Sequence, residues 1–299
     1  MDRLEAMTAF LCVVETGGFA AASRALKVSP PVVTRAVAEL EARLGVRLLA
    51  RTTRVVRVTD AGERYAADCR RILGDIGDAE EAATGIHAAP RGLLTVTAPA
   101  LFGRTYITPV VTAYLERHAE VKVSCWFLDR VVNLIEEGVD VAVRIGELPD
   151  SSLQSTRVGR VRRIVCAAPD YLARHGTPLE PGDLARHSVI SASGVTPVPQ
   201  WRFNQRGTPR VVNLQPRLTT TSNDSAVAAA LAGFGVTRLL SYQVARHLAD
   251  GSLRIVLAEF EPAPLPVHVV HREGRNAPQK VRAFLDMASA ALRADQSLQ

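Results

Sequence analysis

The chain has 299 residues, of which 47% are hydrophobic and 22% charged, and its formal net charge is +6. This composition excludes a disordered chain, and the length suggests about two domains. The four cysteines form no CxxC pair, which excludes a disulfide framework. The longest uncharged apolar stretch, residues 226–236, is shorter than the ~20 residues that span a bilayer, and Asp2, Glu5 and Glu15 interrupt any signal peptide. We therefore expect a cytoplasmic protein with no membrane partner.

Positive charge is concentrated near the N-terminus. Residues 20–59 hold eight Lys and Arg but only two acids, whereas residues 60–81 hold three Arg and seven Asp and Glu. A basic module beside an acidic segment indicates that this region binds a polyanion. An ordinary solvated surface is the alternative.

Hydrophobic periodicity predicts three helices in this module, at residues 3–16, 19–26 and 30–44. Ser29 is the expected N-cap of the third helix, and Gly45 ends it. The apolar stripe of that helix leaves an opposite face that is small apart from one arginine. The pattern predicts a helix-turn-helix, with an ordinary three-helix bundle as the alternative. The residues expected to face double-stranded DNA are Pro30, Pro31, Thr34 and Arg35.

Residues 46–58 are rich in arginine and β-branched side chains, and they predict two short strands around a Thr-Thr turn. Such a basic hairpin beside a helix-turn-helix is a wing. We expect Arg51, Thr52 and Arg54 to reach phosphates or the minor groove.

A long helix is predicted over residues 60–87, with Thr59 as its N-cap. Its apolar side chains alternate at spacings of four and three, which is a heptad pattern and favours pairing with a second copy of the chain. An amphipathic helix that packs on its own domain is the alternative. The expected seam consists of Tyr65, Cys69, Ile72, Ile76, Ala79, Ala83 and Ile86.

Strand and helix signals alternate after residue 92, which predicts an α/β unit with largely parallel sheets. Strands are expected at 93–98, 121–127, 139–144, 164–168, 188–191, 235–239 and 267–271. Helices are expected at 106–118, 131–137, 226–232, 242–248 and 280–293. Ligands of such folds bind beyond the carboxyl ends of the strands.

The chain resembles the LysR-type transcriptional regulators. The resemblance rests on residues 17–19 with the following Ala run, on residues 29–45 and 48–51, and on the Thr-Asp-Ala-Gly sequence at 59–62. Weaker similarity continues through residues 97–103, 140–146 and 223–235, so it covers essentially the whole length.

The resemblance implies a winged helix-turn-helix over residues 1–59, a linker helix over 60–89 and an effector domain over 90–299. That domain is expected to resemble a periplasmic solute-binding protein. Its first lobe would contain residues 90–160 and 267–299, its second lobe residues 161–266, and a small molecule would bind between them. A homodimer, and further a homotetramer, is implied as the assembly on DNA.

Two groups of residues are expected to hold the effector. The first is the segment that follows the first strand of the effector domain and opens a helix, where backbone N–H groups can face a ligand: Ala98, Pro99, Ala100, Leu101 and Phe102. The second group contributes side chains, from Arg144, Trp201, Thr221 and Asn223, together with Gly146, which allows the backbone to approach the ligand closely. Many relatives carry a hydroxyl in the loop that here reads Pro-Ala-Leu-Phe, and this departure from the family pattern favours a more apolar or a differently oriented ligand. For Arg144 a salt bridge at the strand end is the alternative, and for Trp201 a core position.

The competing interpretations are an α/β enzyme or a cytoplasmic solute-binding protein without a DNA role. The sequence contains no Walker loop, GxSxG, HExxH or GxGxxG motif, so we expect no enzyme, no cofactor and no metal. His268 and His271 lie on opposite faces of a predicted strand, which disfavours metal binding. Cys125 and Cys166 are interpreted as free thiols rather than a redox pair.

Overall fold

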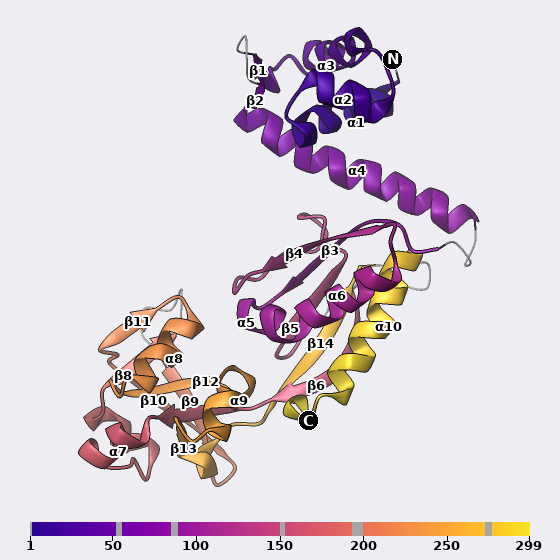
Figure 1. The fold of residues 1–299 in the computed structure, drawn as a ribbon. Helices are drawn as coiled ribbons and strands as arrows, with labels where there is room; N and C mark the ends of the chain where they lie inside the picture. Colours follow the sequence, from indigo (N-terminus) through magenta and orange to yellow (C-terminus); the bar gives the residue numbers. More distant parts are fainter. Residues whose placement is uncertain (1, 52–55, 85–88, 150–152, 193–199, 273–276) are drawn as a thin grey trace. The chain divides into compact units, whose positions relative to one another are not determined.

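The computed structural model describes residues 2–51, 56–84, 89–149, 153–192, 200–272 and 277–299. Contacts divide the chain into two compact units, Met1–Ala88 and Ala89–Gln299 (Figure 1). The first unit is built mainly from helices, and the second contains two five-stranded sheets.

The first unit contains the three short helices, the hairpin and the long helix expected from the sequence. Gly17 and Gly45 adopt left-handed backbone conformations, with φ of 75° and 67°, and thereby end the first and third helices. Buried side chains of all three short helices form one core, which includes Phe10, Ala22 and Leu40. The elements are α1 (Arg3–Thr16), α2 (Phe19–Leu26), α3 (Pro30–Leu44), β1 (Leu49–Arg51), β2 (Val56–Val58) and α4 (Asp60–Thr84).

The N-terminal half of α4 packs on this core. Thr59 caps the helix as expected, since its Oγ1 accepts a hydrogen bond of 3.0 Å from the Gly62 amide. Cys69 is fully buried in the core, and the Tyr65 ring lies 5.9 Å from the Phe10 ring. The expectation that Cys69 faces a second subunit is therefore wrong, because its own unit covers it. Ile72 also packs partly against this core.

The first sheet of the second unit has the strand order β4-β3-β5-β14-β6. Helices α6 and α10 pack against each other and against this sheet (Figure 1). Its strands are β3 (Gly92–Ala98), β4 (Val121–Phe127), β5 (Val141–Ile145), β6 (Gln154–Val161) and β14 (Leu265–His271). Its helices are α5 (Ala100–Phe102), the π-helix η1 (Gly103–Ile107), α6 (Thr108–Arg117), α10 (Gln279–Ala294) and the 3-10 helix η4 (Gln296–Leu298).

The second sheet has the order β11-β8-β12-β7-β13 and a separate core. Its strands are β7 (Arg163–Ala167), β8 (Val189–Ala192), β11 (Leu218–Thr220), β12 (Val236–Leu240) and β13 (Arg254–Val256), with an additional hairpin of β9 (Gln200–Gln205) and β10 (Thr208–Asn213). The helical segments are α7 (Pro169–His175), η2 (Pro181–Arg186), α8 (Asn223–Leu231), α9 (Ser241–Ala249) and η3 (Ala258–Phe260). We call the parts built on the two sheets lobe I and lobe II.

Two expectations about the second unit are wrong. The sheets are mixed rather than largely parallel, because β14 runs antiparallel to β5 and β6, and β7 runs antiparallel to β12 and β13. Residues 131–137 form no helix, because 131–133 are irregular and the following residues, 134–138, form turns. There the Asn133 side chain accepts hydrogen bonds from the Ile135 and Glu136 amides, a local pattern that competes with helical bonding.

Gly62 permits the close approach of α4 to the hairpin. A Cβ atom at this position would lie 2.1 Å from the Leu48 carbonyl oxygen, which belongs to the backbone and cannot rotate away. We expect Gly62→Ala to lower the free energy of unfolding of the first unit by about 1–3 kcal/mol. Differential scanning calorimetry of the whole chain measures this loss.

Gly74→Ala is the matched control in the same helix. No atom lies within 4 Å of its added Cβ, so the higher helix propensity of alanine should stabilise the unit by about 0.5–1 kcal/mol. An equal response of the two variants would contradict the proposed close contact.

Candidate functional site

The N-terminal half of α3 presents an open face. Pro30, Pro31 and Arg35 are exposed and Thr34 is half-buried, while the opposite stripe of the helix is buried in the core. Ser29 occupies the N-cap position without a side-chain hydrogen bond to the helix. Small exposed residues around one arginine let another macromolecule approach the helix backbone closely.

Arg35 is held by an exposed ion pair on this face. Its Nε lies 2.7 Å from Glu39 Oε1, and the Arg35 side chain remains 82% exposed. The guanidinium lowers the pKa of Glu39, chiefly through the hydrogen bond between them. An ion pair so open to solvent is weak, so Arg35 can exchange Glu39 for another anion.

Glu41 connects α3 to the hairpin, a role that the sequence did not reveal. Its side chain is buried, and Oε1 accepts hydrogen bonds from the Leu48 and Leu49 amides at 2.8 and 3.0 Å. The carboxylate thereby fixes the start of β1 relative to the helix. The sequence could have indicated this role, because Glu41 follows Val37 by four residues and therefore lies on the apolar side of the helix.

The expected wing strands are present. β1 pairs antiparallel with β2, and Arg57 is exposed on β2. Thr52 and Arg54 lie outside the described residues, as does the expected seam residue Ile86; the side chains of Arg51 and Ala83 are not described either. In the rest of the seam, Ile76 is half-buried and Ala79 is exposed.

The second unit contains a cleft of about 510 Å³ between its two lobes. The expected site residues that line it are Ala98, Pro99, Arg144, Thr221 and Asn223. Further lining side chains include Leu128, Asp129, Arg130, Val131, Arg163, Arg238, Leu240, Tyr242, Gln243 and Leu265. Residues from both sheets therefore meet in one cavity.

Five other expected effector residues do not line the cleft. Leu101 and Phe102 are buried in the core of lobe I, and Trp201 is buried in the core of lobe II, so direct roles for these three side chains are wrong. The Gly146 amide donates to the Pro266 carbonyl, and the Ala100 amide donates to Asp129.

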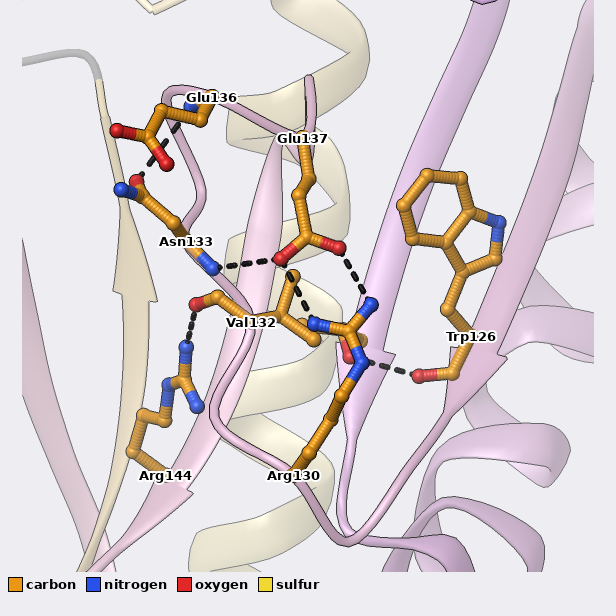
Figure 2. Close-up of polar contacts among 8 residues, drawn as sticks. Trp126, Arg130, Val132, Asn133, Glu136, Glu137 and Arg144 are labelled. Atoms are coloured by element: carbon orange, nitrogen blue, oxygen red, sulfur yellow. Dashed lines mark hydrogen bonds and ion pairs between the residues drawn. The ribbon is translucent and has the colours of Figure 1, made fainter. Parts of the chain in front are cut away.

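Arg144 is held by the backbone rather than by a salt bridge. Its guanidinium donates to the Val132 carbonyl, while Glu137 pairs with Arg130 through bonds of 2.9 and 2.5 Å (Figure 2). The Arg130 bond is the main cause that lowers the pKa of Glu137 to about 2. Burial lowers the pKa of Arg144. These contacts attach the turn segment 130–137 to the cleft wall.

Two further arginines line the cleft that were not predicted from the sequence. Arg163 and Arg238 lie on the adjacent antiparallel strands β7 and β12, and neither has an ion pair with a described acidic residue. The Arg238 guanidinium stacks over the Trp201 ring at 5.0 Å and donates to the Arg202 carbonyl at 3.2 Å. Burial, and then the charge of Arg163, lower the pKa of Arg238 to about 9. Without the pairing of β7 with β12, no sequence spacing connects these residues.

The other candidate sites do not form clusters. Among the described residues, no three His, Cys, Asp or Glu side chains gather as metal ligands. Cys125 is exposed on β4 and Cys166 is buried on β7, so they belong to different sheets, and both are free. Burial raises the pKa of the Cys166 thiol to about 12. Across the described ranges, no helix is both long and apolar enough to cross a membrane.

Both units match known protein families. Residues 4–63 match the family model described as a bacterial regulatory helix-turn-helix protein of the lysR family, and residues 87–293 match the LysR substrate binding domain. The HTH-type transcriptional regulator CrgA of Neisseria meningitidis is 33% identical over 284 residues, which are 94% of each chain. The transcriptional activator AaeR of Escherichia coli is 32% identical over 287 residues, covering 96% of this chain and 93% of AaeR.

The solved structure of CrgA from Neisseria meningitidis matches with a TM-score of 0.62 at 31% identity, over 96% of this chain and 98% of that chain. A helix-turn-helix unit joined to a two-lobed ligand-binding unit defines a DNA-binding transcriptional regulator with a substrate-binding domain. The chain belongs to the LysR family of these regulators.

We expect Glu41→Ala to destabilise the first unit and to weaken DNA binding. The substitution leaves the Leu48 and Leu49 amides without their acceptor, at a cost of about 1–3 kcal/mol for each buried donor. Calorimetry measures the stability, and fluorescence anisotropy with a labelled duplex measures the affinity.

The control is Glu39→Ala, two residues earlier on the exposed face. It should leave the unfolding transition of the unit nearly unchanged, because the ion pair between Glu39 and Arg35 is open to solvent and therefore contributes little to stability. A Glu41→Ala variant as stable as the parent would contradict the anchoring role of this carboxylate.

Proposed function

We propose that this protein regulates transcription in the cytoplasm by binding operator DNA as a homo-oligomer, and that a small organic acid in the cleft modulates this binding. In this proposal it acts as a regulator and not as an enzyme. The observation that carries the proposal is an exposed face of α3 that presents Arg35, on a helix joined to a basic hairpin by Glu41, in the same chain as an arginine-lined cleft.

For DNA, the proposed reading element is the exposed face of α3. Thr34 and Arg35 enter the major groove, and Pro30 and Pro31 shape the first turn beside the DNA backbone. Arg51, Thr52 and Arg54 of the wing contact phosphates or the minor groove. Base reading is thus assigned to α3, and sequence-independent affinity mainly to the wing.

For the effector, the cleft favours an anion with an apolar body. Arg144, Arg163 and Arg238 line it and are all half-buried, so a bound anion would compensate their charge. Leu128, Val131, Leu240 and Leu265 supply apolar surface in the same cavity. Val131 is 84% exposed, so covering it with a ligand removes apolar area from water.

For the assembly, we propose that two copies of the chain pair through the C-terminal half of α4. Ile76 and Ala79 leave apolar surface outside the core of their own unit, whereas Cys69 is fully enclosed. The heptad spacing continues through Ala83 and Ile86. Pairing of dimers into a homotetramer belongs to the same proposal.

Selection from a pool of randomised duplex DNA tests the function directly. Repeated rounds of capture by the purified protein and sequencing should enrich one motif with two related half-sites, since a two-fold dimer reads two half-sites. Retention of DNA without any enriched motif would contradict sequence-specific regulation. Failure to retain DNA at low salt would contradict DNA binding itself.

We expect Arg35→Ala to reduce discrimination at one base pair in each half-site by about 1–3 kcal/mol, the contribution of one arginine–guanine contact. Anisotropy titrations of the enriched motif and of a scrambled duplex measure this difference. Arg51→Ala and Arg54→Ala should instead weaken binding to both duplexes and flatten the salt dependence. Equal losses on both duplexes for Arg35→Ala would contradict base reading.

We expect Ile76→Asp to weaken dimerisation at least thirtyfold, since the dimer buries two such carboxylates and their burial together costs roughly 2 kcal/mol or more. Light scattering at micromolar concentration measures the mass. The control is Gly77→Asp, which adds the same charge at the next, exposed position. An Ile76→Asp variant that keeps the parent mass would exclude this seam.

A further inference from the structure

Asp129 lies in the cleft and connects the two lobes. One carboxylate oxygen accepts a hydrogen bond of 2.9 Å from the Ala100 amide of lobe I. The other accepts a bond of 3.3 Å from the Asn223 side-chain amide, at the start of α8 in lobe II. A single carboxylate therefore uses one donor from each side of the cleft.

The two donors are those that a ligand would need. The backbone amides after β3 and the amide of Asn223 are the groups expected from the sequence to hold an effector across the cleft. Asp129 is the only acidic residue among the described residues that line the cavity, whereas four arginines line it. The Asp129 carboxylate thus uses two hydrogen-bond donors that the carboxylate of a bound organic acid could use as well.

We propose that Asp129 is an internal substitute for the effector: in the free protein its carboxylate occupies the position of the ligand's carboxylate, and an organic acid must displace it to bind. This inference rests on the proposed function, in which the cleft binds an organic anion. The internal group has the advantage of a high effective concentration, so it lowers the apparent affinity of every competing acid.

The lobes keep other contacts when Asp129 leaves. Arg104 of lobe I and Asp224 of lobe II form a separate ion pair of 3.4 Å. Tyr242, which follows β12 of lobe II, packs edge-on against Phe102 of lobe I with ring centroids 5.3 Å apart. Displacement of Asp129 therefore exchanges one carboxylate for another between two lobes that remain in contact.

The test measures benzoate binding to the full chain by titration calorimetry, with neutral benzamide as the uncharged comparison. In Asp129→Asn the side chain keeps its size but loses its charge. We expect this variant to bind benzoate about tenfold more tightly than the parent, because a competitor that fills the site about nine-tenths of the time has been removed. The affinity for benzamide should change less than twofold.

Asp224→Asn is the matched control. It also removes a negative charge and a contact between the lobes, but Asp224 does not line the cleft. Its benzoate affinity should stay within about threefold of the parent. An equal gain in both variants would show that loosened lobes, and not a vacated anion position, explain the effect, and would overturn the inference.

The remaining outcomes separate this inference from the function on which it rests. If the parent binds benzoate and Asp129→Asn binds it no more tightly, the inference fails and the organic-anion cleft stands. If neither the parent nor Asp129→Asn binds benzoate, the organic-anion assignment fails together with the inference. DNA selection tests the regulatory function independently of both results.

Discussion

The pairing of β14 with both β5 and β6 is the constraint on which the second unit depends. Because β14 lies between these strands, the chain must leave the first sheet after β6, build the second sheet and return. Two connecting segments consequently join the lobes, and Arg162 and Glu261 link them through two bonds of 2.9 and 3.0 Å. The cleft follows from this topology, since each lobe has its own sheet and core.

Both functional surfaces use arginine, but in different surroundings. Arg35 is almost fully exposed, so its interactions are screened by salt and depend on a polyanion that brings many charges at once. Arg163 and Arg238 are half-buried beside each other, where water compensates their charge poorly. A single small anion can therefore have a large effect in the cleft, whereas DNA needs an extended surface.

Carboxylates of the chain itself determine which of these arginines and backbone amides are available to bind an external anion. Glu41 is buried and anchors the hairpin, and Glu137 neutralises Arg130 within the cleft wall. Glu39 and Asp129 are different, because each holds its partners in surroundings that solvent or a ligand can enter. In both proposals, binding of an external anion therefore begins with the exchange of an internal carboxylate.

The sequence by itself determined the first unit closely, from the three short helices to the cap at Thr59, because helix bonds, caps and apolar stripes are local. It also located Pro99, Arg144 and Asn223 in the cleft, through their places at strand and helix ends. Only the tertiary structure decided that Cys69 is covered by its own unit, that Phe102 and Trp201 lie in cores, and that Arg163 and Arg238 lie on neighbouring strands. Antiparallel pairing and burial depend on residues far apart in the chain, and no local spacing encodes them.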